Sequence, residues 1–138
     1  ISAFSRDQIR ELLKLARYLV INHHEFEVLK TNGGLTDKEV FGQVPEVVLT
    51  RGDKGVAIYS GGGICHVDAV PDVKVNEVTG CGDAFRAGYA YGIVNNLNLT
   101  ERAQAGCIMA ARNLENPETQ RYRITATELD ALRTTIYG

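Results

Sequence analysis

Apolar residues recur along this chain at two spacings, which predict an alternation of helices and strands. Near the N-terminus they recur every three or four residues from Ile9 onward, the period of a helix with one packed face. Ser5 and Gln8 have the spacing of a capping box, and Phe4 and Ile9 that of a hydrophobic staple, so this helix is predicted to begin after Ser5. Similar start signals predict three more helices, beginning near Thr36, Thr100 and Thr125.

Four short runs rich in β-branched and aromatic residues predict strands. They cover residues 18–21, 46–50, 56–60 and 64–67. The first two are continuous apolar runs separated by helical segments, as in buried parallel strands, and the last two flank Gly61–Gly63, as in a hairpin. The order of elements therefore predicts an α/β fold: a mainly parallel sheet with one β-hairpin, covered by helices, in a single unit over residues 1–138.

The composition excludes several classes of protein. The 138 residues are 44% apolar and 23% charged, with a formal net charge of −2 and no cluster of Lys or Arg, so we expect no nucleic-acid or anionic-membrane partner. No apolar run approaches the length that spans a bilayer. Cys65, Cys81 and Cys107 are odd in number and widely spaced, which argues against a disulfide framework and against a zinc site of paired cysteines. We expect a cytoplasmic protein with reduced thiols.

The stretch VTGCGDAFRAG, residues 78–88, is the first candidate for chemistry. Gly80 and Gly82 flank Cys81 just before a predicted helix that begins at Asp83. A helix N-terminus carries unpaired N–H groups and a partial positive charge, and glycines let the backbone approach a phosphate closely. The stretch therefore fits an anion site for a phosphoryl group, with Asp83 as a base. An ordinary glycine-rich turn, with Asp83 as a capping acid, fits the same residues equally well.

Two other polar segments directly follow predicted strands. The segment NHHE, residues 22–25, follows the run at 18–21, and TRGDKG, residues 50–55, follows the apolar part of the run at 46–50. Open α/β sheets bind ligands at the carboxyl ends of their strands. We therefore expect both segments to border a ligand site.

Together, three motifs resemble those of the ribokinase-like carbohydrate and nucleoside kinases, the PfkB family. They are Asn22-x-x-Glu25, Thr50-x-Gly52-x-x-Gly55 and Thr79-Gly80-Cys81-Gly82-Asp83, in the family's order and spacing. GCGDAFRAG, with ETQRY at residues 118–122, is most similar to the bacterial adenosine-kinase-like members. The resemblance covers the family's C-terminal, nucleotide-binding half. The acceptor-binding half and the lid, which precede it in the family, are not in this sequence.

The resemblance implies an ATP-dependent phosphotransferase with the ribokinase-like fold. Asp83 matches the catalytic base that takes the proton from the acceptor hydroxyl, and the backbone of Gly80, Cys81 and Gly82 matches the anion hole for the γ-phosphate. The implied acceptor is the hydroxyl of a sugar or a nucleoside, with an adenosine-like acceptor favoured.

The resemblance also implies ATP and Mg²⁺ as cofactors. Asn22 and Glu25 match the motif that organises Mg²⁺ and its waters. Family members commonly have Asp where this chain has Glu77, and in many of them that Asp helps to bind K⁺; the longer Glu77 side chain moves this metal-binding carboxylate and argues against potassium activation. The positions that match nucleotide-binding residues are Thr50, Gly52, Gly55, Thr79 and, in the adenine pocket, Cys107.

A second hypothesis is a nucleotide-binding module without turnover. The chain would then be a sensor of adenine nucleotide, or a half-protein that requires a partner chain. Glu77, Glu118 and the absent half favour this alternative. Because the acceptor-binding half is missing, we expect the 138 residues alone to be inactive, and a homodimer would form through the missing lid. Arg86, in the first turn of the predicted helix, either contacts a phosphate or is a solvated surface residue.

Overall fold

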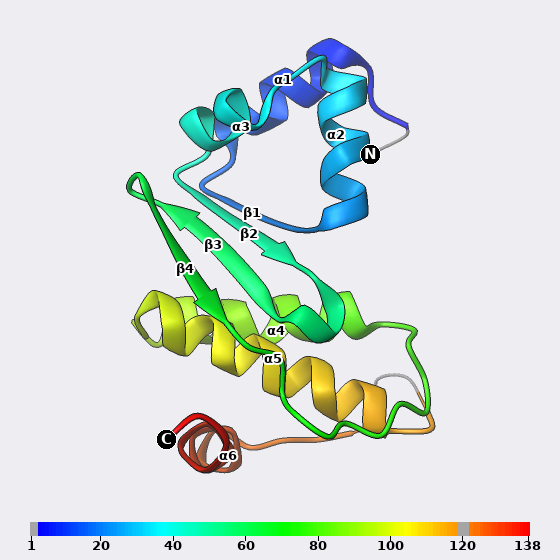
Figure 1. Ribbon diagram of the computed structural model, residues 1–138, viewed down its shortest axis with the longest axis vertical. Helices are drawn as coiled ribbons and strands as arrows, with labels where there is room; N and C mark the ends of the chain where they lie inside the picture. Colours follow the sequence, from blue (N-terminus) through cyan, green and yellow to red (C-terminus); the bar gives the residue numbers. More distant parts are fainter. Residues whose placement is uncertain (1–2, 119–121) are drawn as a thin grey trace. The chain divides into compact units, whose positions relative to one another are not determined.

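The computed structural model describes residues 3–118 and 122–138 (Figure 1). In chain order the elements are α1 Arg6–Leu15, β1 Tyr18–Asn22, α2 His23–Gly33, α3 Asp37–Gln43, β2 Glu46–Thr50, η1 Gly52–Lys54, β3 Val56–Ser60, β4 Gly63–Val67, α4 Cys81–Val94, α5 Leu99–Glu115 and α6 Ala126–Tyr137. They group into two compact units, Ile1–Gly52 with Val56–His66, and Asp53–Gly55 with Val67–Gly138. The expectation that residues 1–138 fold as a single unit stays a prediction.

In the first unit, helices α1, α2 and α3 pack on one face of the sheet through a shared apolar core (Figure 1). Ile9 of α1, Phe26 of α2 and Val47 of β2 are buried together in this core. The stacked rings of Phe26, Phe41 and Tyr59 extend it, with successive ring centroids 5.6 and 4.0 Å apart. Burial of these apolar groups fixes β1 and β2, at whose ends two of the predicted motifs lie.

The sheet has the strand order β1-β2-β3-β4. β1 pairs with β2 in parallel, with Tyr18 opposite Glu46 and Asn22 opposite Thr50, and β3 pairs with β2 antiparallel. Gly61 and Gly62 have φ of 58° and 80° and form the two-residue turn between β3 and β4. Positive φ at both positions is typical of tight hairpins, so the predicted hairpin is confirmed.

The expected α/β class with its helices is confirmed, but the pairing within the described strands is not mainly parallel. Residues 51–55 alone connect β2 to β3, which is too short for the crossover that a parallel pair requires. β1 is also less buried than predicted, because it is the end strand in this order. Its first three residues are only partly buried, whereas the first four of β2 are buried.

In the second unit, α4 and α5 form an antiparallel hairpin closed by residues 95–98 (Figure 1). The two helices approach closely because glycines face the opposite helix. A Cβ at Gly88 would lie 2.5 Å from the carbonyl oxygen of Ala105, and one at Gly106 would lie 2.7 Å from the ring of Phe85. Leu129 of α6 packs against α5 in a second apolar cluster. α4 and α5 therefore lie too close together at Gly88 and Gly106 to accommodate an added methyl group.

The four helix starts predicted from capping signals are confirmed, one of them with a different capping residue. Three capping residues lie where they were expected, each in a complete capping box: Ser5, Thr36 and Thr125. The start of α5 is Leu99, next to the expected Thr100, but Thr100 is not its cap. Its cap is Asn98, whose side chain accepts the Glu101 N–H while the Glu101 side chain accepts the Asn98 N–H.

Three smaller observations complete the fold. Cys65, Cys81 and Cys107 form no disulfide with one another in the structure. Across residues 3–118 and 122–138, no helix combines the length and the apolar character needed to cross a membrane. Residues 119–121 of the ETQRY stretch lie outside the described residues.

Candidate functional site

The segment before α4 forms a tight turn that requires glycine at position 80. The Cys81 N–H donates to the Val78 carbonyl oxygen at 3.2 Å, and Gly80 has φ of 80° and ψ of 1°. These are the angles of the third residue in a type II β-turn, which residues with a side chain rarely adopt. The Gly80 carbonyl in turn accepts the Ala84 N–H at 2.9 Å. Gly80 is thus the N-cap, and α4 begins two residues before the predicted Asp83.

Among the described α-helices, α4 is the one without a side-chain N-cap. Each of α1, α2, α3, α5 and α6 begins with a complete capping box. At α4 the N-cap is Gly80, and no side chain accepts a hydrogen bond there. The unpaired N–H groups at a helix start carry about half of a positive elementary charge. The first turn of α4 therefore has donors available for an acceptor that approaches from outside the chain.

The three amides predicted as the anion hole differ in their hydrogen bonding. The Cys81 N–H already donates to Val78, whereas the N–H groups of Gly80 and Gly82 have no acceptor in the part of the chain that the structure describes. The Cys81 thiol is partly buried, and this burial raises its pKa. A raised thiol pKa opposes formation of a nucleophilic thiolate. Burial therefore argues against a nucleophilic role for the Cys81 sulfur.

Asp83 lies in the first turn of α4 and forms an ion pair with Arg86. The Arg86 Nη1 and Asp83 Oδ1 atoms are 2.9 Å apart, and the two side chains are 46% and 67% exposed. An exposed pair of this kind contributes only about 0–1 kcal/mol, so Asp83 can exchange it for another partner at little cost. Asp83 also lines a pocket of about 500 Å³ together with Ala84, Ala87 and residues 122–125. The carboxylate is therefore accessible.

Residues 76–79 are held against the C-terminal end of α5. The N–H groups of Asn76 and Glu77 donate to the Leu114 carbonyl oxygen at 2.7 and 3.3 Å, and Asn76 Nδ2 donates to the next carbonyl at 2.7 Å. From α5, Asn113 Nδ2 donates to the Thr79 carbonyl oxygen at 2.8 Å. Carbonyl groups in the last turn of a helix lack partners within the helix. The loop supplies those partners, and α5 thereby fixes the position of the turn.

Glu77 has a structural contact inside this loop. Its Oε1 atom accepts the Thr79 N–H at 2.8 Å. Hydrogen bonds from the Thr79 side chain and backbone hold the pKa of the Glu77 carboxyl below its ordinary value. The ionised carboxylate thus stabilises the segment just before the turn by hydrogen bonding. This role needs no metal ion.

Asn22 and Glu25, predicted to organise Mg²⁺, form the capping box of α2. Asn22 Oδ1 accepts the Glu25 N–H at 2.8 Å, and Glu25 Oε2 accepts the Asn22 N–H at 3.3 Å. Asn22 also pairs with Thr50, so two predicted motifs lie side by side at the carboxyl ends of β1 and β2. Over the described ranges, no group of three or more His, Cys, Asp or Glu residues could hold a metal ion.

Two glycines follow β2, and the structure favours glycine at the two positions for different reasons. Gly52 and Gly55 both have positive φ, 60° and 73°. A Cβ at Gly55 would lie 2.1 Å from the Val67 carbonyl oxygen, so packing excludes any side chain there. A Cβ at Gly52 would meet nothing within 4 Å. Gly52 therefore leaves open space just beyond the end of β2.

Cys107, the predicted adenine contact, is a buried residue of α5. It is only 8% exposed. Burial is the main cause that raises the pKa of this thiol to about 11. Cys107 does not line the pocket beside Asp83, and its contact with adenine stays a prediction.

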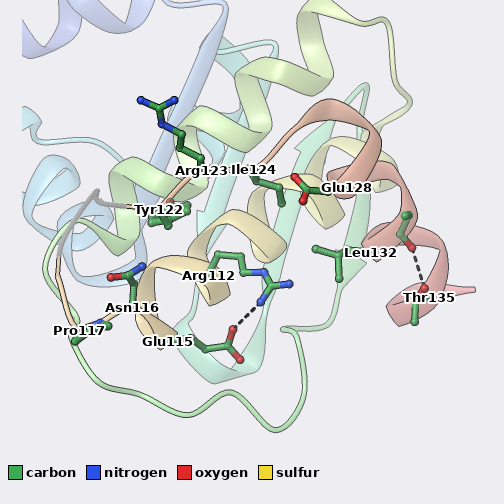
Figure 2. Close-up of a pocket in the computed structure, with 11 residues that line it drawn as sticks. Arg112, Glu115, Asn116, Pro117, Tyr122, Arg123, Ile124, Glu128, Leu132 and Thr135 are labelled. Carbon is green, nitrogen blue, oxygen red and sulfur yellow. Dashed lines mark hydrogen bonds and ion pairs between the residues drawn. The ribbon is translucent and has the colours of Figure 1, made fainter.

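A second pocket, whose lining residues Figure 2 draws, is formed by the C-terminal end of α5, residues 122–124 and α6. Its volume is about 540 Å³. Arg112 and Glu115 form an ion pair in it, with Nη1 and Oε2 3.4 Å apart, and the guanidinium of Arg123 points away from that pair. Residues 122–124 also line the pocket beside Asp83. No site residue predicted from the sequence lines this second pocket.

Sequence reasoning missed two contacts of the site, for different reasons. The Asp83–Arg86 ion pair has a local signal, because opposite charges three residues apart on a helix are neighbours. The bond from Asn113 to Thr79 joins residues 34 positions apart, and no local pattern indicates it.

Comparisons with known proteins identify the family of the chain. Residues 1–125 match the family described as pfkB family carbohydrate kinase. A nucleoside kinase of Methanocaldococcus jannaschii is 26% identical over 108 residues, which are 78% of this chain and 36% of that protein. A ribokinase of Lactococcus lactis is 24% identical over 106 residues, which are 76% of this chain and 34% of that protein.

A comparison with solved structures agrees with the sequence matches. The nucleoside kinase of Burkholderia thailandensis, solved in complex with inosine, superposes with a TM-score of 0.94 at 30% identity, over 99% of this chain and 46% of that one. The chain spans about a third of the length of the two curated relatives and less than half of this solved structure. The α/β fold is thus ribokinase-like, and the chain belongs to the pfkB family of carbohydrate kinases.

Proposed function

We propose that the protein containing this chain transfers the γ-phosphoryl group of ATP to a hydroxyl group of a nucleoside or sugar. The observation that carries the proposal is the uncapped start of α4, whose available N–H groups lie next to the accessible carboxylate of Asp83. Family membership supports phosphoryl transfer to an alcohol. The likeness to a nucleoside kinase solved with inosine supports a nucleoside, and an adenosine-like one in particular, as the acceptor.

In this proposal the start of α4 stabilises the charge that develops during transfer. Asp83 accepts the proton of the attacking hydroxyl group. The N–H groups of Gly80 and Gly82 donate to phosphate oxygens, aided by the positive end of the helix, while Cys81 holds the turn in place. Arg86 pairs with Asp83 in the structure, and its exposed guanidinium can turn toward a phosphate oxygen instead.

ATP and Mg²⁺ fit the residues that are present. Mg²⁺ prefers oxygen ligands and keeps several of its waters, and it neutralises phosphate charge when bound. The side-chain oxygens of Asn22 and Glu25 already accept each other's backbone N–H groups, so they fit the orientation of those waters better than direct contact with the ion. The bond between Glu77 and Thr79 supports a site that does not use K⁺. The proposed nucleotide contacts are Thr50, Gly52, Gly55, Thr79 and Cys107.

The test is turnover by the natural full-length protein with ATP, Mg²⁺ and a panel of nucleosides and sugars, beside an Asp83→Asn variant. We expect the variant to bind a non-hydrolysable ATP analogue like the parent, with turnover lower by at least about 100-fold, the usual loss of a general base. Asp130→Asn is the matched control, because Asp130 also pairs with an arginine three residues on, Arg133, but lies on α6. Its turnover should not change.

Two results would contradict the proposal. Undiminished turnover in Asp83→Asn would remove Asp83 from the reaction. ATP binding by the parent without turnover of any acceptor would favour the alternative, a non-catalytic adenine-nucleotide-binding module or a half-protein that requires a partner chain. Homodimerisation through the lid of the family fold stays a prediction, to be measured on the same full-length protein.

A further inference from the structure

We propose that Asn113 of α5 is a positioning residue that sets the orientation of the Thr79–Gly80 peptide, and with it the direction of the Gly80 N–H. This inference rests on the function proposed above, in which that N–H faces a phosphate. Asn113 is fully buried, at 0% exposure, and its Nδ2 atom donates to the Thr79 carbonyl oxygen at 2.8 Å.

The orientation of this peptide is one of two that the turn allows. Type I and type II β-turns differ mainly by rotation of the peptide between the second and third residues. In the turn at residues 78–81 that peptide joins Thr79 to Gly80, and the angles of Gly80 identify type II. A trans peptide holds its C=O and N–H on opposite sides. The bond from Asn113 to the Thr79 carbonyl therefore also directs the Gly80 N–H away from Asn113.

The local sequence does not choose between the two orientations. Glycine adopts negative φ about as readily as positive φ, so Gly80 suits a type I turn as well. The hydrogen bond from the Cys81 N–H to Val78 closes either type of turn. The bonds from Asn76 and Glu77 to Leu114 hold the start of the loop but do not involve this peptide. Asn113 supplies the contact that selects one orientation.

Asn113 also has an unfavourable effect on stability, so packing alone does not explain an amide at this position. Its Oδ1 atom is buried and has no hydrogen-bond partner in the described part of the chain. A buried acceptor without a partner destabilises a fold, and an apolar side chain of similar size would avoid that penalty. The donor that Asn113 offers to Thr79 accounts for an amide at this position.

The test compares two variants of the natural full-length protein, labelled at threonine and glycine for NMR. Asn113→Leu removes both the donor and the unpartnered acceptor, and Asn113→Asp keeps the shape but replaces the donor with an acceptor. Asn95→Leu is the matched control, because Asn95 Nδ2 also donates to a backbone carbonyl, that of Tyr91, at 2.9 Å, at the other end of α4. The structural readout is the nuclear Overhauser effect between the Thr79 Hα and the Gly80 N–H. It is strong in a type II turn, where the second residue has ψ of about 120°, and weak in type I, where ψ is about −30°.

We expect a strong effect in the parent and in Asn95→Leu, and a weak one in both Asn113 variants. Turnover should fall at least about tenfold in kcat in both Asn113 variants, with KM for ATP nearly unchanged, because the misdirected donor acts mainly in the transition state. The midpoint of thermal unfolding should not fall in Asn113→Leu. A merely structural role would lower that midpoint and leave the Overhauser effect strong.

Each other outcome is also decisive. A strong Overhauser effect in both Asn113 variants would show that Asn113 does not set the peptide. A weak effect without loss of kcat would show that the peptide direction does not matter for transfer. If the parent shows no turnover at all, the proposed function fails, while the Overhauser comparison still decides whether Asn113 orients the turn.

Discussion

Replacing Gly88 with alanine should force α4 and α5 apart. The added Cβ would lie 2.5 Å from the carbonyl oxygen of Ala105, 2.8 Å from its carbonyl carbon and 2.8 Å from the Met109 side chain. Two of these three atoms belong to the backbone, so rotation of a side chain cannot relieve the overlap. We take about 3 kcal/mol for this overpacking, the upper end of its usual range. Alanine gains about 1 kcal/mol over glycine within a helix, which leaves a net loss of about 2 kcal/mol.

Urea unfolding of Gly88→Ala and the parent measures this loss. With a slope of about 2 kcal/mol per molar urea, the unfolding midpoint should fall by about 1 M. Gly42→Ala is the control, because Gly42 lies in α3 and a Cβ there would meet nothing within 4 Å. That variant has the same gain in helix propensity without the overlap, so its midpoint should rise. If Gly88→Ala is as stable as the parent or more stable, the close approach of α4 and α5 is refuted.

Two further predictions concern ions and protons. Replacing K⁺ with Na⁺ in the kinase assay should leave turnover unchanged, because the Glu77 carboxylate is bonded to Thr79, and loss of turnover in Na⁺ would contradict this. Stability should decrease in acid, because hydrogen bonds hold the pKa of several glutamates below the ordinary value of 4.5. Above pH 4.5 these ionised carboxylates stabilise the folded state. The stabilisation is lost as the pH falls through their lowered pKa values. Urea midpoints should therefore fall between about pH 5 and pH 3, less steeply in Glu128→Gln than in the parent, and a flat profile would count against the reasoning. These glutamates are Glu39, Glu77, Glu101 and Glu128.

Four helix starts were predictable because their signals are local. The start of α2 was not predicted, because Asn22 and Glu25, which form its capping box, were interpreted as a metal-site motif. Ser5 and Gln8 are three residues apart, and the box they form depends on nothing else in the chain. The same logic failed at α5 only in the choice of cap, since Asn98 and Glu101 also have this spacing and Thr100 does not. Strand direction is a property of the sheet and not of the strand. The short connection at residues 51–55 was the one sequence signal that β3 would run antiparallel to β2.

The candidate site was predictable where it depends on backbone freedom. Glycine at positions 80 and 82, followed by Asp83, indicated an exposed helix start, and the structure has such a start. The distribution of hydrogen bonds within it was not predictable. That Cys81 donates to Val78 depends on the angles of Gly80, and that Asn113 reaches Thr79 depends on the packing of α5 against α4.

Because α4 has no side-chain N-cap, the stability of this helix would depend on anions in the surrounding solution. Five other helices carry the acceptors for their own first turns in capping boxes. An anion seated on the first turn of α4 at a hundred times its dissociation constant would add about 2.7 kcal/mol to folding by mass action. Depletion of that anion would loosen this helix before the others, so resistance to proteolysis near Gly80 would follow ligand supply.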